Sequence, residues 1–308
     1  MELLKSFLWI IIGFILLVKG ADLFVDNAAG LARKLGVSSL VIGLTVVAFG
    51  TSLPELSVSM IAAIQGSNEI AVGNVVGSNI FNLLIVAGLS ACIYPVVVNP
   101  TIMKRDWPLS MVAAILLIIF LIPDLTISRM EAIILLVVFV YTLYAQFKDA
   151  KQEDEERKEE NKSYVQLIGL LILGIIGIVI GGQFAVDGAI DLAHFMGLSE
   201  TLIGLTIVAI GTSLPELVTS VVAARNKESE IALGNVIGSN LFNIFFILGF
   251  STLIHPIQVE FTAIIDGIVL AIVSFIYWII VKRKGLDRKV GACMVMTYIL
   301  YTIYIIVR

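Results

Sequence analysis

A stretch of two hydroxyls, a proline and a carboxylate occurs twice in this chain, with identical letters (Gly-Thr-Ser-Leu-Pro-Glu) at residues 50–55 and 211–216. Each copy lies within a long apolar segment, where Glu55 and Glu216 are expensive to bury and therefore mark a functional site. The glycine and proline interrupt a helix and free main-chain carbonyls. Together the copies offer carboxylate, hydroxyl and carbonyl oxygens, the ligands that hard cations prefer.

A second polar motif, Gly-Asn-Val-x-Gly-Ser-Asn-x-Phe-Asn, also occurs twice, at residues 73–82 and 234–243. Ser78 lies four residues before Asn82, and Ser239 lies four before Asn243, so each pair places a hydroxyl and an amide on one helix face. Four such faces, two from each motif, can meet around one point. Helix packing through small and polar residues is the alternative for this second motif.

All the candidate ligands are oxygen donors, which excludes soft metal ions and favours Na⁺, Ca²⁺ or Mg²⁺. Mg²⁺ usually keeps several waters, so a dry cage fits Ca²⁺ better. Two close carboxylates repel in a low-dielectric site, and one is expected to be protonated when the site is empty. A divalent cation neutralises both, as do two or more monovalent cations or protons. If the negative charge of the site must be neutralised before the site can open to the other side of the membrane, ion exchange is favoured over passive leak.

The composition places this site in a membrane. Of the 308 residues, 59% are hydrophobic and 14% are charged, too apolar for a soluble domain of this size. No basic stripe suggests nucleic acid as a partner. Cys92 and Cys293 lie in apolar segments and are expected to be packed thiols, so no zinc site, disulfide framework or other cofactor is predicted.

The predicted fold class is an all-α polytopic membrane protein with ten transmembrane helices, since a span takes about 20 residues. The apolar stretches lie at 3–31, 38–64, 69–95, 107–123, 128–147, 164–192, 199–224, 230–254, 261–281 and 290–307. The first stretch has a counterpart in mid-chain, so it is expected to belong to the fold rather than to be a signal peptide.

The two halves of the chain form a repeat with an offset of 161 residues. At that offset, 16 of the 22 positions from 42 to 63 are identical. This predicts an N-terminal repeat at 1–147, a charged linker at 148–163 and a C-terminal repeat at 164–308. Because each half has five spans, the second must enter the membrane from the opposite side. Two inverted five-helix repeats are typical of secondary transporters.

The predicted orientation follows from the basic residues. The loops after spans 1, 3, 5, 7 and 9 hold 16 of the 20 lysines and arginines. The positive-inside rule therefore predicts a cytoplasmic linker and both termini outside the cell membrane. Three tryptophans near span ends are expected to be interfacial anchors: Trp9, Trp107 and Trp278.

Other charged residues in or near the spans are expected to be structural. Lys19 has no basic counterpart in the second half and is expected to pair with Asp22. Asp26 and Asp187 occupy equivalent positions near the ends of spans 1 and 6. They are expected to be helix caps or a structural pair, and the alternative is a role in ion entry. Two glutamates are expected to favour the dipoles of the helices that they begin: Glu69 and Glu230.

The paired motifs resemble the two alpha repeats of the calcium/cation antiporter superfamily, and most closely its sodium/calcium exchanger branch, over nearly the whole chain. The resemblance implies a transporter rather than an enzyme, in which Na⁺ entry drives Ca²⁺ out by alternating access. It implies that Glu55 and Glu216 bind both ions, and that Thr51 and Thr212 contribute main-chain oxygens to Ca²⁺. It assigns the Na⁺ sites and the central ring to Ser52, Ser78, Ser213, Ser239, the carbonyls of Ala48 and Ala209, Asn82 and Asn243.

One departure from the family pattern concerns the coupled ion. Some family members, including the potassium-dependent exchangers, carry an acid where Asn243 stands, and the proton-coupled branch has an acid in the second motif. Asparagine at this position favours Na⁺ coupling over the H⁺/Ca²⁺ and K⁺-dependent alternatives of the same fold. A cation channel is the alternative from another class. An intramembrane enzyme would need a nucleophile with a base, or histidine ligands, and no such set is found.

The resemblance also suggests which parts move. Spans 1 and 6 are expected to slide against a core of spans 2, 3, 7 and 8. The expected partners are Ca²⁺, Na⁺ and the lipid bilayer, and a monomer is the working expectation. The charged linker contains no ligand set for a cation, so exchange is expected to proceed without it.

Overall fold

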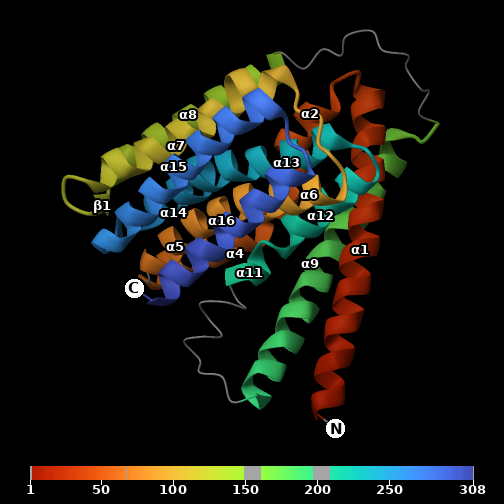
Figure 1. The fold of residues 1–308 in the computed structure, drawn as a ribbon, viewed down its shortest axis with the longest axis horizontal. Helices are drawn as coiled ribbons and strands as arrows, with labels where there is room; N and C mark the ends of the chain where they lie inside the picture. Colours follow the sequence, from red (N-terminus) through yellow and green to blue (C-terminus); the bar gives the residue numbers. More distant parts are fainter. Residues whose placement is uncertain (1, 67, 149–160, 197–208, 308) are drawn as a thin grey trace.

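The computed structural model describes residues 2–66, 68–148, 161–196 and 209–307, which are almost entirely helical (Figure 1). The elements, with η for π-helical stretches, are α1 (Glu2–Leu35), α2 (Ser39–Ile42), η1 (Gly43–Val47), α3 (Ala48–Thr51), α4 (Leu53–Gln65), α5 (Asn68–Phe81), η2 (Asn82–Val86), α6 (Ala87–Ile93), η3 (Ile102–Asp106), α7 (Trp107–Leu121), β1 (Thr126–Ile127), α8 (Arg129–Lys148), α9 (Tyr164–Phe195), α11 (Ala209–Thr212), α12 (Leu214–Arg225), α13 (Ser229–Leu241), η5 (Phe242–Leu248), α14 (Gly249–Ile254), β2 (Ile257–Gln258), α15 (Phe261–Lys284) and α16 (Arg288–Val307). The short strands β1 and β2 pair antiparallel.

Seven of the described helical stretches are long and apolar enough to cross a membrane. An eighth is the pair Ser39–Thr51 and Leu53–Gln65, which bends by 50° at its break. The predicted span 107–123 corresponds to α7, which has 15 residues, and the start of the predicted span 199–224 lies outside the described residues. The chain is therefore a multi-pass helical membrane protein, while the count of ten spans stays a prediction.

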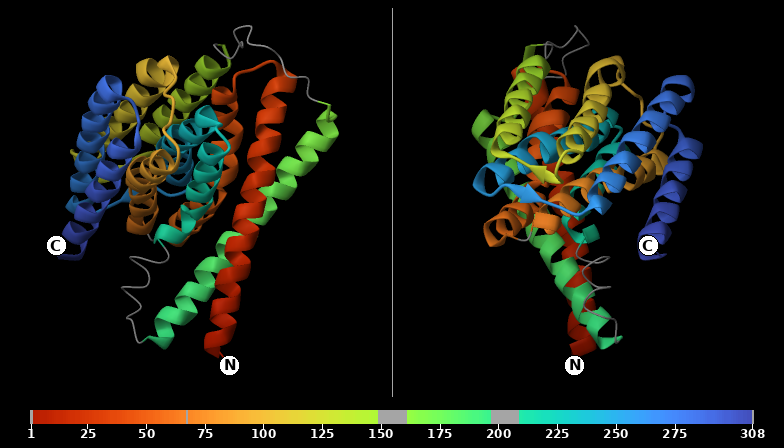
Figure 2. Two further views of the ribbon diagram at one scale, coloured as in Figure 1. Left: turned by 45° about the vertical axis from the view of Figure 1, so that its right-hand side comes forward. Right: turned by 90° about the vertical axis from the view of Figure 1, so that its left-hand side faces the viewer.

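Helices α1 and α9 lie side by side and project beyond the other helices (Figure 2). Glycines of both helices lie in their contact. A Cβ added to Gly13 would lie 2.5 Å from the main-chain nitrogen of Ala185, and one on Gly181 would lie 2.6 Å from that of Leu17. At this glycine seam the two main chains approach each other more closely than any side chain would allow.

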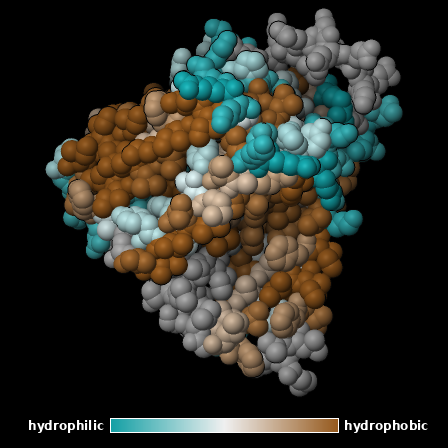
Figure 3. Space-filling model, viewed as in Figure 1, coloured by the Kyte–Doolittle hydropathy of each residue, from teal (hydrophilic) through white to brown (hydrophobic). Residues whose placement is uncertain are grey.

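The two central spans carry the second motif. In the most apolar 18 residues of each span, 72% are buried in Ile70–Ile93, which combines most of α5 with η2 and α6, and 94% are buried in Ser229–Ile254, which combines α13, η5 and α14. Helices α7, α8, α15 and α16 pack around them, and their outer sides expose apolar residues such as Val137 and Val140. Apolar side chains cover much of the face shown in Figure 3, as expected of a surface in contact with lipid.

Two expectations about single residues are wrong. The Trp107 side chain is fully buried rather than interfacial, and its indole N–H donates to Ser274 Oγ at 3.0 Å, because a buried indole needs an acceptor. Asp22 pairs with Arg225 of α12 rather than with Lys19. Asp26 accepts a hydrogen bond from Asn226 and Asp187 from Gln183, which leaves their predicted roles open. Glu230 lies in the first turn of α13, as predicted, whereas the side chain of Glu69 lies outside the described residues.

Candidate functional site

The first motif interrupts a helix in both halves. Helix α3 ends at Thr51, Ser52 leaves the helical region (φ −84°, ψ 11°), and α4 begins at Leu53 with Pro54 in its first turn. In the second half, Ser213 has nearly the same dihedral angles (φ −92°, ψ 5°). Proline is favoured at a helix start because its missing N–H needs no partner there. The sequence therefore places each serine at a break and its glutamate in the first turn that follows.

The two breaks are connected by hydrogen bonds between the halves. The Ser213 hydroxyl donates to Glu55 Oε1 at 2.9 Å, and the Ser52 hydroxyl donates to Glu216 Oε1 at 2.8 Å. All four side chains are fully buried. Each carboxylate is thus positioned by the serine of the opposite repeat.

The serines of the second motif complete both contacts. Ser78 Oγ lies 3.0 Å from Ser213 Oγ and 3.4 Å from Glu55 Oε1. Its counterpart Ser239 lies 3.0 Å from Ser52 Oγ. The structure therefore brings the two motifs together, as the sequence predicts, on helices α5 and α13.

Four site residues were not among the predicted ligands: Asn74, Asn235, Asn79 and Asn240. The Asn74 amide donates to the main-chain carbonyl of Glu55 at 3.1 Å and to Ser59 Oγ at 2.9 Å, and its oxygen accepts from Thr212. Asn235 makes the equivalent three contacts in the other half: its amide donates to the Glu216 carbonyl and to Ser220 Oγ, and its oxygen accepts from Thr51. These amides support the main chain at the breaks. Their sequence signal was the repeat itself, since both are identical in the two copies of the second motif.

A second pair of amides joins α5 to α13 near the remaining predicted residues. The side chains of Asn79 and Asn240 each donate to the other's main-chain carbonyl, at 3.1 Å and 3.2 Å. The Asn243 amide nitrogen donates to Asn79 Oδ1 at 3.0 Å, and Asn82 does not repeat this contact. The two halves of the site are therefore similar but not equivalent.

Several buried oxygen atoms in the site have no hydrogen-bond partner among the described residues. They include Oε2 of both glutamates and Oδ1 of both Asn82 and Asn243. Buried polar atoms are rarely left without a partner, and unpaired carboxylate oxygens are costly in hydrocarbon. An oxygen-coordinated cation satisfies such a set, and no cluster of three or more His, Cys, Asp or Glu side chains occurs in the described parts of the chain.

The predicted carbonyl ligands lie one turn before the breaks. The Ala48 carbonyl accepts from the main-chain N–H of Ser52 at 3.1 Å and retains a second lone pair for another contact. Ala209 begins α11, four residues before Ser213. The Thr51 hydroxyl donates to Asn235 Oδ1 at 3.0 Å, which fixes its position beside the break.

Residues 5–148 and 166–307 match the family described as sodium/calcium exchanger protein. The putative antiporter CaxA of Alkalimonas amylolytica is 37% identical, and the alignment covers 97% of this chain and 98% of the relative. The sodium/calcium exchanger MaX1 of Methanosarcina acetivorans is 36% identical, with 97% of each chain covered. A solved structure of the sodium-calcium exchanger NCX_Mj, soaked with Na⁺ and Sr²⁺, superposes with a TM-score of 0.86 at 35% identity and covers 97% of each chain.

Proposed function

Because this chain belongs to the sodium/calcium exchanger family, we propose that it exchanges Na⁺ for Ca²⁺ across a membrane by alternating access. The observation that carries the proposal is the pair of fully buried carboxylates, Glu55 and Glu216. Each is held through one oxygen by a serine of the opposite repeat, while its other oxygen has no partner among the described residues. This leaves two anionic oxygens directed to a cation rather than to the protein.

The proposed ion ligands are the residues of the two repeated motifs. Glu55 and Glu216 bind Ca²⁺ and also Na⁺. Main-chain oxygens of Thr51 and Thr212 are further ligands of Ca²⁺. The Na⁺ sites and the central ring take Ser52, Ser78, Ser213, Ser239, Asn82, Asn243 and the carbonyls of Ala48 and Ala209. The cross-repeat contacts of the serines support this set, because they gather both halves around one centre.

The proposed architecture has ten spans in two inverted repeats, residues 1–147 and 164–308, joined by a cytoplasmic linker at 148–163. Asn79 and Asn240 are counterparts in the repeat, and each donates the same hydrogen bond to the other's main-chain carbonyl. This reciprocal pair supports an approximate two-fold relation between the halves. The distribution of lysine and arginine supports both termini outside. In this arrangement α1 and α9 slide against the core that contains the breaks.

The same geometry supports exchange rather than a channel. With both glutamates ionised and no cation bound, two buried negative charges face each other across the linked serines, which disfavours any change of access. Loading with one Ca²⁺, or with two or more Na⁺, removes that cost. The change of access is therefore coupled to ion occupancy, as antiport requires.

The test is Ca²⁺ uptake into proteoliposomes loaded with Na⁺. Parallel vesicles carry K⁺ in place of Na⁺, or an outward proton gradient without Na⁺. We expect uptake only with internal Na⁺. Uptake driven by protons, or uptake that needs K⁺ in addition to Na⁺, contradicts the proposed coupling but keeps the glutamate site. Ca²⁺ flux that needs no counter-ion and does not saturate indicates a channel and overturns the proposal.

A further inference from the structure

The carboxylate of Glu230, in the first turn of α13, joins two other segments of the chain. Its Oε2 accepts from the main-chain N–H of Leu40 at 3.2 Å, and its Oε1 accepts from the side-chain amide of Asn99 at 2.6 Å. Leu40 is the second residue of α2, where N–H groups lack partners within the helix and an anion is favoured. Glu230 therefore caps the first part of the broken span from another helix. These three residues form the Glu230 bridge.

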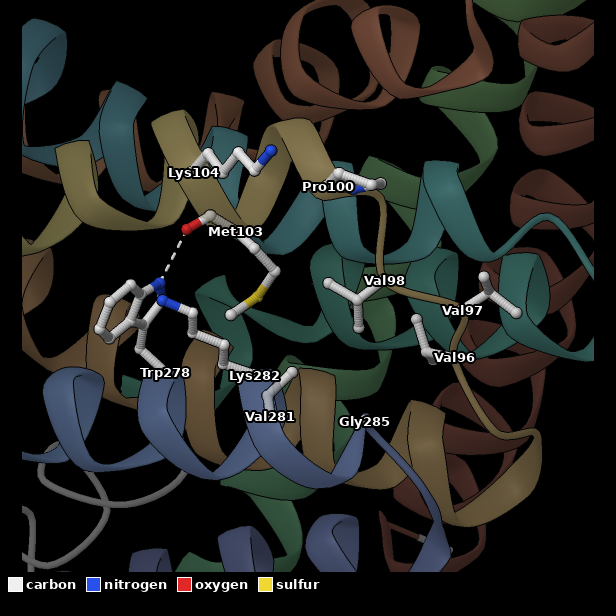
Figure 4. A pocket seen from close by; sticks show the side chains of 10 residues that line it. All are labelled: Val96, Val97, Val98, Pro100, Met103, Lys104, Trp278, Val281, Lys282 and Gly285. Carbon is white, nitrogen blue, oxygen red and sulfur yellow. Dashed lines mark hydrogen bonds between the residues drawn. The ribbon is translucent and has the colours of Figure 1, made fainter.

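Asn99 is held in place by its own segment, which connects α6 to η3. Its Oδ1 accepts from the Thr101 main-chain N–H at 2.8 Å, and this bond leaves the amide nitrogen for Glu230. The neighbouring Val98 and Pro100 line a pocket, whereas Asn99 between them does not belong to its lining (Figure 4). Hydrogen bonds to a charged acceptor are stronger than those between neutral groups. The bridge is thus a strong polar contact among three segments.

Beyond the bridge, the first part of the broken span lies against α13 with its main chain. A Cβ added to Gly234 would lie 3.1 Å from the Cα of Gly43, and one on Gly238 would lie 2.5 Å from the carbonyl oxygen of Leu44. Glycines permit this close approach of two helices. The Glu230 bridge lies at one end of the contact, and the break with its proposed ion ligands lies at the other.

The two repeats differ at this contact. No described residue lies within 4 Å of a Cβ added to Gly73 or Gly77, the counterparts of Gly234 and Gly238. Gly73 is exposed, whereas Gly234 is buried. Within the described parts of the chain, a broken span therefore covers the core helix at one end only, the end where α13 begins.

The chemistry of the bridge also belongs to one repeat. The counterpart of Glu230 is Glu69, and the counterpart of Asn99 is Glu260. Two ionised carboxylates have no donor between them and repel each other, so these residue types cannot form the same bond. The bridge therefore favours the single arrangement in which α2 lies on α13.

We propose that Glu230 is a positioning residue that holds the first part of the broken span on α13 and so keeps the ion pathway closed at the end where α13 begins. Among the described contacts, its carboxylate bonds to none of the proposed ion ligands. It acts through Leu40 and the helical stretch that leads from there to Ala48 and Thr51. The inference rests on the proposed function, because such closure matters only if access alternates.

The first experiment measures how fast a buried thiol reacts in the full-length protein in detergent. The two natural cysteines are replaced by serine, and Val47→Cys places a thiol at a fully buried position of η1, which packs on α13. We expect Glu230→Gln to raise the rate of reaction with a hydrophilic methanethiosulfonate roughly tenfold. This is the effect of losing a hydrogen bond to a charged group, since one donor then faces an amide nitrogen.

Glu131→Gln is the matched control. Glu131 lies in the first turn of α8 and accepts from the main-chain N–H of Ser128 at 2.6 Å, so its described bond stays within one helix start. This variant loses the same kind of bond without joining separate segments, and its thiol rate should equal that of the parent.

An exchange of side chains separates the bridge from a general loss of stability. Asn99→Asp brings a second acid to Glu230 and should also raise the thiol rate. In the double variant Glu230→Gln with Asn99→Asp, the introduced amide donates to the introduced carboxylate and still accepts from Leu40, so the rate should fall back to about that of the parent. A double variant as reactive as the single variants overturns the proposal, as does an unchanged rate in both. Asn99→Ala removes one donor without adding charge, and its unchanged rate overturns the proposal where an acid variant does not fold.

Transport tests the link to access. In vesicles that hold the protein in one orientation, Glu230→Gln should raise the apparent Ca²⁺ affinity on one side and lower it on the other. An equal fall on both sides overturns the role in access. If the parent protein shows no Na⁺-driven Ca²⁺ uptake, the proposed function fails, while the thiol rates still decide whether Glu230 holds α2 on α13.

Discussion

Asn79 and Asn240 form a reciprocal pair of hydrogen bonds. The side-chain amide of each residue donates to the main-chain carbonyl of the other, at 3.1 Å and 3.2 Å. The two residues are counterparts in the repeat, so the pair of bonds is unchanged when the halves are interchanged. A junction of this kind can persist in both access states, because each state is expected to resemble the other with its repeats exchanged. In the proposed mechanism, the crossing of α5 and α13 is therefore expected to stay fixed while the access changes.

The two halves of this junction differ in one contact, which gives a first prediction. Asn79 Oδ1 also accepts from Asn243, so Asn79→Ala frees an amide of the ion ring and Asn240→Ala does not. We expect both variants to lose about 1 kcal/mol of stability, as for an interhelical hydrogen bond in a membrane. Only Asn79→Ala should also weaken Ca²⁺ affinity, by roughly fivefold to tenfold. Thermal unfolding in detergent and the concentration dependence of uptake measure the two effects, and equal affinities contradict the assignment.

The glutamates provide the most direct test of the site. Glu55→Gln and Glu216→Gln each remove an anionic ligand while preserving the shape of the side chain. We expect Na⁺-dependent Ca²⁺ uptake to fall by about a hundredfold or more, since a loss of roughly 3 kcal/mol at an ion ligand has that effect. Glu260→Gln, at an exposed residue before α15, is the matched control and should transport normally. Normal uptake by either site variant in a monodisperse protein would falsify the ligand assignment.

The serines at the breaks should matter through the carboxylates that they position. Ser52→Ala and Ser213→Ala remove donors to Glu216 and Glu55, and a hydrogen bond to a charged group contributes about 1.5–3 kcal/mol. We expect Na⁺ affinity to fall by roughly tenfold to a hundredfold in each. Ser57→Ala is the control, because this exposed hydroxyl bonds only to the Leu53 carbonyl of its own helix among the described contacts. Steady-state uptake against Na⁺ concentration separates the variants.

The ion pair between Asp22 of α1 and Arg225 of α12 should bias the access equilibrium. The residues equivalent to Asp22 and Arg225 in the other repeat are Gln183 and Ile64, which cannot form an ion pair. The opposite access state, in which the repeats are expected to swap conformations, therefore has no equivalent pair. Arg225→Gln should therefore shift the equilibrium away from the access state that the structure adopts, raising the apparent Ca²⁺ affinity on one side of the membrane and lowering it on the other. The shift should be about twofold to fivefold, the range of a partly exposed pair. Arg283→Gln, at the exposed end of α15, should change neither affinity.

The charged linker is expected to be dispensable for exchange. Deleting residues 151–158 removes most of the acidic run and none of the ligands or contacts of the site. We expect Na⁺-driven uptake within about twofold of the parent, since substitutions away from such features have small effects. Loss of uptake in a deletion variant that inserts and purifies normally would show that the run takes part in transport.

The site could be read from the sequence because its residues repeat. Glu55, Ser52 and Ser78 are each duplicated at one offset within apolar stretches, so their types alone predict a polar centre. The reciprocal bonds of Asn79 and Asn240 could not be read in this way, because they depend on how two helices cross. The π-helical stretch that precedes Ala48 and the one that begins at Asn82 were likewise not predicted, since no local residue pattern specifies them.

Burial of single side chains was the other limit. Trp107 looked like an interfacial anchor because it lies near the end of an apolar stretch. Its full burial arises where α7 packs on α15, and Ser274 of α15, far along the chain, supplies the acceptor for its indole. The pairing of Asp22 with Arg225 has the same cause, because sequence proximity favours Lys19 whereas the packing of α1 on α12 brings Arg225 closer.

The glycine seam between α1 and α9 limits how many arrangements the molecule can adopt. If each of these helices moved by its own route, four combinations would arise, including one with the pathway open at both ends and one with it shut at both. If α1 and α9 slide as proposed, the close main-chain contacts at Gly13 and Gly181 favour movement of the pair as one body. One movement of the helix pair then opens one end of the pathway as it closes the other. In the proposed mechanism, this close contact therefore disfavours a state in which the pathway is open at both ends.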